Sequence, residues 1–161
     1  MHDVELNYRL TGKGWAECFL QIGGASSTIT ASYLSDPVSD LIVASEQLLQ
    51  GAVEQRVSFL EEPGEFRLIL SPETPSLLHV RVLSFTDSHP HRPDSAGSII
   101  FDSQCDLLRF ARAVSRTFQS VLDLHGVVGY KELWSTSDFP LSSLQSLKQS
   151  IRQKTNLPIS T

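Results

Sequence analysis

The sequence is poor in the residues that mark several large classes of protein. It has only two cysteines, Cys18 and Cys105, which are too few and too far apart for a disulfide framework or a zinc-ligand set. No uninterrupted apolar run approaches the roughly 18 residues that a membrane-spanning helix needs. The chain starts with MHDVELNYRL, which lacks the basic and then apolar regions of a signal peptide. We therefore expect a cytoplasmic protein that does not bind a membrane.

Basic residues are also too few for a typical nucleic-acid-binding protein. Lys and Arg number 13 against 18 Asp and Glu, so the formal net charge is −5. Affinity for nucleic acid depends on Lys and Arg side chains that neutralise phosphates, so we expect no nucleic-acid partner. The acidic balance is typical of an ordinary cytosolic protein, and it also suits a protein that binds a basic partner.

The motifs of the common enzyme classes are missing as well. The chain contains no GxxxxGK[ST] or GxGxxG nucleotide loop, no GxSxG or HExxH motif and no kinase motif. We therefore predict no cofactor and assign no catalytic residue. Whether the protein catalyses any reaction stays open at this stage, and so does its oligomeric state.

The residues that are present predict an α+β fold in a single domain, residues 1–161. Apolar residues that alternate with polar ones predict a three-stranded meander over 3–34 and further strands over 55–102. Apolar residues spaced three or four apart predict three helices, over 37–50, 104–125 and 140–154. Short turns between successive strands favour antiparallel pairing. We expect one antiparallel sheet of about six or seven strands, with the three helices packed on one face.

The helical spacing also predicts the core. Six apolar residues of the helices are expected to be buried: Leu41, Leu48, Phe110, Val114, Phe118 and Leu144. Cys18 alternates with apolar residues on a strand and is expected to join them, whereas Cys105 is expected at the start of the long helix. Gly126 should end that helix, leaving residues 127–139 irregular but rich in aromatic side chains.

The segment 86–97 is the clearest long loop, and it carries the residues with the most chemical character. Its candidate metal ligands are Asp87, His89, His91 and Asp94. Two imidazoles one residue apart, flanked by carboxylates, are able to bind a metal ion, and a small metal-dependent enzyme would follow. The alternative is a solvated, mobile loop on which no backbone hydrogen bond depends.

Two further groups of residues suggest binding. Glu61, Glu62 and Glu65 surround a Pro-Gly turn, where they form either a partner-binding acidic cluster or an exposed hairpin tip. Trp134 is a candidate anchor for a partner if it is exposed, and otherwise belongs to a satellite core under the last helix. Arg109, Arg112 and Arg116 fall at helical neighbour spacing and form either an anion-binding ridge or a solvated face.

Several conspicuous motifs span nearly the whole chain. They are Trp15-Ala16-Glu17-Cys18; Tyr33-Leu34-Ser35-Asp36-Pro37 with Asp40-Leu41; Glu61-Glu62-Pro63-Gly64-Glu65 with Arg67; and Gly129-Tyr130 with Trp134 and Phe139-Pro140. Together they resemble a family of uncharacterised bacterial proteins, many of them actinobacterial. The build is similar to that of the immunity proteins of contact-dependent and polymorphic toxin systems. That resemblance implies a non-enzymatic inhibitor that binds a basic protein or toxin. The alternatives are the metal-dependent enzyme and a structural or oligomer-forming accessory protein.

Overall fold

The computed structural model describes residues 2–156, so Met1 and residues 157–161 of the predicted domain lie outside the described part. The elements in chain order are β1 (Val4–Gly12), β2 (Trp15–Ile22), β3 (Ala25–Ser32), α1 (Pro37–Leu49), β4 (Gln55–Leu60), β5 (Glu65–Pro72), β6 (Leu77–Phe85), the 3-10 helix η1 (Asp94–Ala96), β7 (Ser98–Asp106), α2 (Leu107–Trp134) and α3 (Leu141–Thr155). The described residues therefore form the predicted α+β fold with three α-helices.

The seven strands form two antiparallel sheets, so the prediction of a single sheet is wrong. Strands β1, β2 and β3 make a three-stranded sheet, and β4 to β7 make a four-stranded sheet, each in chain order. The division falls where α1 interrupts the series of hairpins, because β3 and β4 do not pair through their backbones. They meet through a side chain instead, since the Ser32 hydroxyl donates a 3.0 Å hydrogen bond to the carbonyl oxygen of Leu60.

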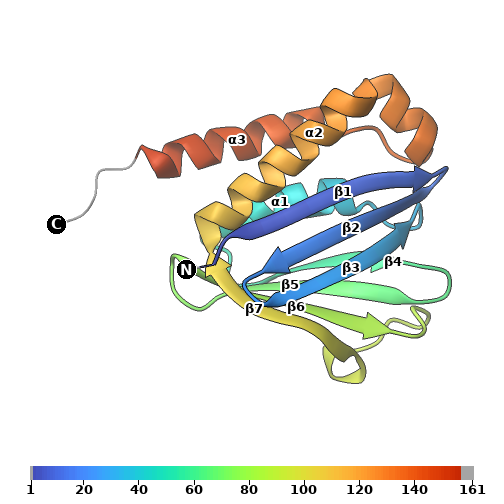
Figure 1. The fold of residues 1–161 in the computed structure, drawn as a ribbon, viewed down its shortest axis with the longest axis horizontal. Helices are drawn as coiled ribbons and strands as arrows, with labels where there is room; N and C mark the ends of the chain where they lie inside the picture. The colour runs from blue at the N-terminus through green and yellow to red at the C-terminus, as the bar shows by residue number, and fades with distance from the viewer. Residues whose placement is uncertain (1, 157–161) are drawn as a thin grey trace.

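The core lies between the inner faces of the two sheets and the three helices (Figure 1). All six helical residues predicted to be buried expose at most 2% of their surface, which confirms that prediction. Phe118 of α2 packs edge-on against Tyr8 of β1, with the ring centres 5.2 Å apart. Cys18 is buried in the same core, as expected.

Helix α2 starts later than the sequence predicted, and it contains a second helical segment beyond the predicted end. Residues 104–106 belong to β7, and Asp106 caps α2 by accepting a 2.9 Å hydrogen bond from the backbone N–H of Arg109. Gly126, with φ 68° and ψ 173°, lies outside the helical region, so the first helical segment ends there as predicted, but a second segment resumes at once and continues to Trp134. The expected irregular segment is therefore confined to residues 135–140.

The helices hold one another and one end of the first sheet. Side chains of Ser146 and Ser150 on α3 donate hydrogen bonds to Glu46 of α1. The backbone N–H of Gly14, in the β1–β2 turn, donates a 2.7 Å hydrogen bond to the carbonyl oxygen of Leu133 near the end of α2. Within residues 2–156, none of the helices has the length and apolar character needed to cross a membrane.

Candidate functional site

The acidic turn between β4 and β5 is only partly exposed. Glu62 is exposed and Glu61 is half-buried, and burial raises the pKa of Glu61. Glu65 is buried, which contradicts its prediction as an exposed partner-binding residue. The reason lies on the same strand, because Glu65 and Arg67 are two residues apart and therefore project from the same face of β5.

Arg67 organises a buried network on that face. Its guanidinium donates to both carboxylate oxygens of Glu65, at 3.0 and 3.1 Å, and to Asp94 at 2.8 Å. It also lies over the ring of Phe85, 4.3 Å from the ring centre, and the side chain exposes only 2% of its surface. Glu65 accepts a further 2.9 Å hydrogen bond from the hydroxyl of Ser58. Both buried charges are thus satisfied, as a stable buried ion pair requires.

The four candidate metal ligands of the 86–97 loop do not converge. His89 and His91 are exposed, and Asp87 accepts a 3.0 Å hydrogen bond from the backbone N–H of His89. Asp94 binds Arg56 and Arg67 instead, and hydrogen bonds, first from Arg56 and then from Arg67, lower the pKa of Asp94 to about 2. In the part of the chain that the structure describes, no three His, Cys, Asp or Glu side chains are grouped to hold a metal ion.

The same loop is anchored at several points, so the expectation that no backbone hydrogen bond depends on it is wrong. The backbone N–H and the hydroxyl of Ser88 both donate to the carbonyl oxygen of Pro63, at 2.8 and 2.9 Å. Gly97 sits so close to Phe85 that a Cβ atom on it would lie 2.7 Å from the ring. The loop therefore covers the buried Glu65–Arg67 ion pair. That ion pair in turn holds the loop in place from inside the fold, through the hydrogen bond from Arg67 to Asp94.

Trp134 is fully buried and makes no partner-binding surface. Its indole N–H and the hydroxyls of Tyr8 and Tyr130 are buried without a hydrogen-bond partner among the described residues. Burial raises the pKa of both tyrosines. Tyr130 packs edge-on against Phe139, with the ring centres 5.3 Å apart. This aromatic segment belongs to the core, which is the second of the two alternatives that its sequence left open.

Two exposed aromatic residues and a neighbouring leucine lie elsewhere, at the end of the molecule that carries the acidic turn. Trp15, Tyr33 and Leu34 expose 38%, 45% and 51% of their surfaces. The exposure of Trp15 follows from the alternating pattern of β2, because Ala16 and Cys18 face inward and Trp15 lies on the opposite face. No pattern in the sequence marks Tyr33 and Leu34, which occupy the turn between β3 and α1.

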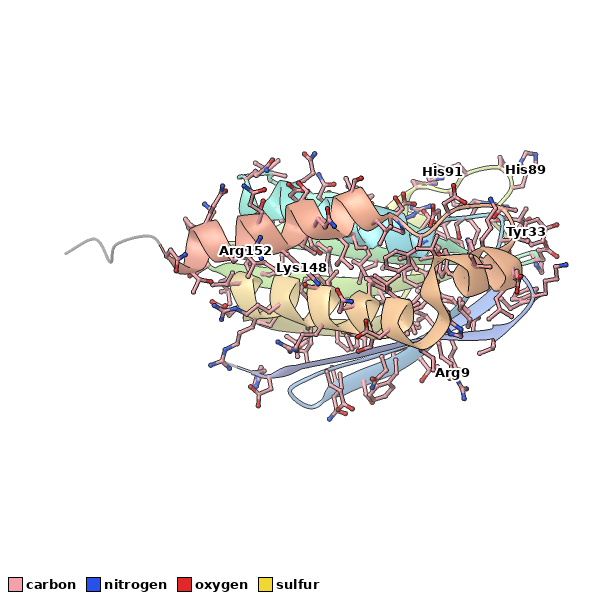
Figure 2. All side chains as sticks on the ribbon, turned by 90° about the horizontal axis from the view of Figure 1, so that it is seen from above. Arg9, Tyr33, His89, His91, Lys148 and Arg152 are labelled. Carbon is pink, nitrogen blue, oxygen red and sulfur yellow. The ribbon has the colours of Figure 1, made fainter. Side chains whose placement is uncertain are left out.

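A strand pairing, a packing contact and a hydrogen bond of the neighbouring Ser35 connect these three residues to the acidic turn. Trp15 lies opposite Ser32 in the β2–β3 ladder, and the ring of Tyr33 packs on Gly14. The hydroxyl of Ser35 accepts a 2.9 Å hydrogen bond from the backbone N–H of Leu60, the residue before Glu61. We call the resulting patch the loop-end surface; it consists of Trp15, Tyr33, Leu34, Glu61 and Glu62. Figure 2 shows Tyr33 at the same end of the molecule as His89.

A hollow of about 450 Å³ lies between the end of α1, the β5–β6 turn and the start of α2. Its walls include Leu49, Pro75 and Leu107, and its polar groups include Glu73 and Lys154. Glu73 is already engaged, because it accepts a 2.8 Å hydrogen bond from the amide of Gln104. The lining of the hollow therefore mixes apolar and polar groups, and its one carboxylate is not free to act as a base.

Neither cysteine is available as a nucleophile. Cys105 lies in β7 and not at the start of the long helix, where its sequence position had placed it. Both Cys18 and Cys105 are buried, and burial raises the pKa of each thiol to about 12. Both thiols are therefore protonated at neutral pH, which removes their nucleophilic form.

Among the described residues, the 86–97 loop thus assembles no group of metal ligands, and the loop-end surface exposes Trp15, Tyr33 and Leu34. The likeness to actinobacterial and immunity proteins stays a hypothesis drawn from the sequence motifs. Comparisons with protein-family models, curated proteins and solved structures gave no match to this chain.

Proposed function

We propose that the protein is a non-enzymatic binding protein of the immunity type, which inhibits a basic protein or toxin by binding it through the loop-end surface. The observation that carries this proposal is the exposure of Trp15, Tyr33 and Leu34 beside Glu61 and Glu62. Exposed apolar patches rimmed by polar residues are typical of protein interfaces, and Trp and Tyr contribute much of the binding energy there.

The two kinds of residue in this surface have different roles in binding. Tyr33 and Trp15 offer large, fairly rigid side chains that lose little entropy when a partner covers them. Glu62 and the half-buried Glu61 give the rim a negative charge, which accelerates the approach of a basic partner. Glu65 has no direct part, because its carboxylate is committed to Arg67 inside the fold.

The test uses the purified products of the genes adjacent to the one that encodes this chain. Each product is passed over the immobilised protein, and association and dissociation rates are measured for any complex. We expect the W15A/Y33A variant to dissociate at least about tenfold faster, because it loses buried contact area. We expect E61Q/E62Q mainly to slow association and to flatten its dependence on salt.

The matched control is L124A/V128A, which removes two exposed apolar side chains from the bend of α2. That variant should bind like the unmodified protein. If no adjacent gene product binds, or if a complex forms and W15A/Y33A leaves its dissociation rate unchanged, this function is wrong.

A further inference from the structure

A basic groove, made of two adjoining hollows, runs from α3 across α2 to the start of β1, in a chain whose overall charge is negative. Arg112 and Arg116 of α2 line one hollow together with Lys148 and Arg152 of α3, and the same two arginines line a second hollow with Arg109, Asp3 and Val4. Figure 2 shows Lys148 and Arg152 along α3, on the side that faces α2. The sequence alone revealed only the α2 half of this set, because the other two cations come from a helix about thirty residues further on.

The cations of the groove are poorly neutralised by the protein itself. Within residues 2–156, Asp3 is the only carboxylate that pairs with them, at 3.1 Å from Arg109. Arg112 donates to the hydroxyl of Thr155 and Lys148 donates to the side-chain oxygen of Gln119, both of which are uncharged acceptors. The side chains of Arg116 and Arg152 make no hydrogen bond or ion pair within those residues. Five positive charges thus gather around one carboxylate, although the chain as a whole carries −5.

The groove is deep enough to hold part of a ligand. Two adjoining hollows of about 270 and 280 Å³ share Arg112 and Arg116 as a common wall. Ile151 lines the first hollow among the cations, so this part of the groove offers an apolar contact. Arg109 and Arg116 are seven residues apart on one helix, which separates them by roughly 10 Å along the axis.

We propose that this groove binds an acidic segment of a partner protein, with carboxylates on the arginines and an apolar side chain on Ile151. The planar guanidinium group binds carboxylates through two parallel hydrogen bonds, and the groove offers several such groups at separate positions. A single-stranded nucleic acid fits less well, because its bases stack on aromatic rings and the residues lining the groove include none. The groove shares no residue with the loop-end surface, so the two proposals stand or fall separately.

The test is a titration of the intact protein into a fluorescent synthetic peptide of about ten residues in which Glu and Leu alternate. Fluorescence anisotropy gives the dissociation constant. We expect R112A/R116A to weaken binding at least about tenfold, and we expect binding to weaken as salt is raised, because exposed charges are screened. Both arginine side chains reach solvent, so the variant should keep the unfolding midpoint of the unmodified protein.

Controls separate this site from general attraction between opposite charges. The matched variant R92Q/K131Q removes two exposed positive charges outside the groove and should leave peptide binding unchanged. The charge-reversed variant R112E/R116E should weaken binding of the Glu-Leu peptide more than R112A/R116A does, because like charges repel.

Two outcomes would overturn the proposal. One is equal loss of peptide binding in R92Q/K131Q and R112A/R116A. The other is tighter binding to a single-stranded oligonucleotide of equal charge, or to phosphatidylserine vesicles, with R112A/R116A abolishing it. The second outcome would reassign the groove to phosphate.

Discussion

Arg67 exposes almost none of its surface, yet it carries a full charge on the outer face of a sheet. Glu65 and Asp94 neutralise it and Phe85 lies beneath it, so each group of the network depends on the others. Removing the cation would leave a buried carboxylate without its partner. Leaving one buried charge unpaired lowers the free energy of unfolding by more than the intact ion pair contributes to it.

We therefore predict that R67M lowers the free energy of unfolding by about 3–5 kcal/mol, measured by urea denaturation. The double variant E65Q/R67M should lose less, because it also removes the orphaned charge. By contrast, R9A should cost less than about 1 kcal/mol, since the Arg9–Glu17 pair is exposed. Equal losses for R67M and R9A would show that the network does not stabilise the fold.

The lowered pKa of Asp94 makes the free energy of unfolding depend on pH. Its pKa of about 2 in the fold lies below the ordinary 3.8, so it adds stability above about pH 4 that is lost as the pH falls towards 2. In D94N this contribution is absent at every pH. We expect D94N to be less stable than the unmodified protein at pH 7, and the difference to shrink between pH 4 and pH 2. Denaturant titrations of both proteins across that range provide the measurement.

Part of this network was predictable from the sequence. Glu65 and Arg67 are two residues apart on a strand, and this spacing alone puts them on one face. Their burial was not predictable, because it depends on Asp94, 27 residues further along the chain, and on a loop with no periodic pattern. Local spacing likewise assigned Trp134 two possible environments, and only the packing of the completed fold selected the buried one.

At the scale of elements, Gly126 decides the path of α2. Its backbone, with φ 68° and ψ 173°, lies in a region that only glycine occupies readily, while Gly129 has ordinary helical geometry. We predict that G126A lowers stability by about 1–3 kcal/mol, because the added Cβ meets open space but strains the backbone. G129A should instead raise stability by up to about 1 kcal/mol, because alanine favours a helix. Thermal unfolding of the two variants gives opposite shifts if the bend is as described, and shifts of the same sign contradict it.

The element boundaries show where sequence patterns reach their limit. The stripe of apolar residues predicted α2, but Cys105 and its neighbours extend the alternation of β7, and only hydrogen bonding to β6 assigns them to a strand. The division into two sheets was also beyond the reach of local sequence patterns. Every hairpin was local and therefore predictable, whereas the break between β3 and β4 depends on pairing across α1, which no local pattern records.

At the scale of the molecule, one core joins the two sheets, and the two cysteines report on it. Cys18 lies in the three-stranded sheet and Cys105 in the four-stranded sheet, and both are buried. If the sheets unfold together, both thiols should become reactive with the same opening free energy, equal to the free energy of global unfolding. Alkylation in low urea, with each thiol followed by mass spectrometry, measures the two values. Earlier reaction of one thiol would show that its sheet opens separately.

The fluorescence of this protein comes from one buried and one exposed tryptophan. Trp134 is sealed in the core, whereas Trp15 stands at the loop-end surface with 38% of its area in solvent. A soluble quencher such as acrylamide should therefore dim Trp15 and spare Trp134 until the protein unfolds. W15F leaves Trp134 as the single tryptophan, and with excitation at a wavelength that tyrosine hardly absorbs, its emission reports unfolding alone. The emission of Trp15, which W15F removes, is the part that would change when a partner covers the loop-end surface.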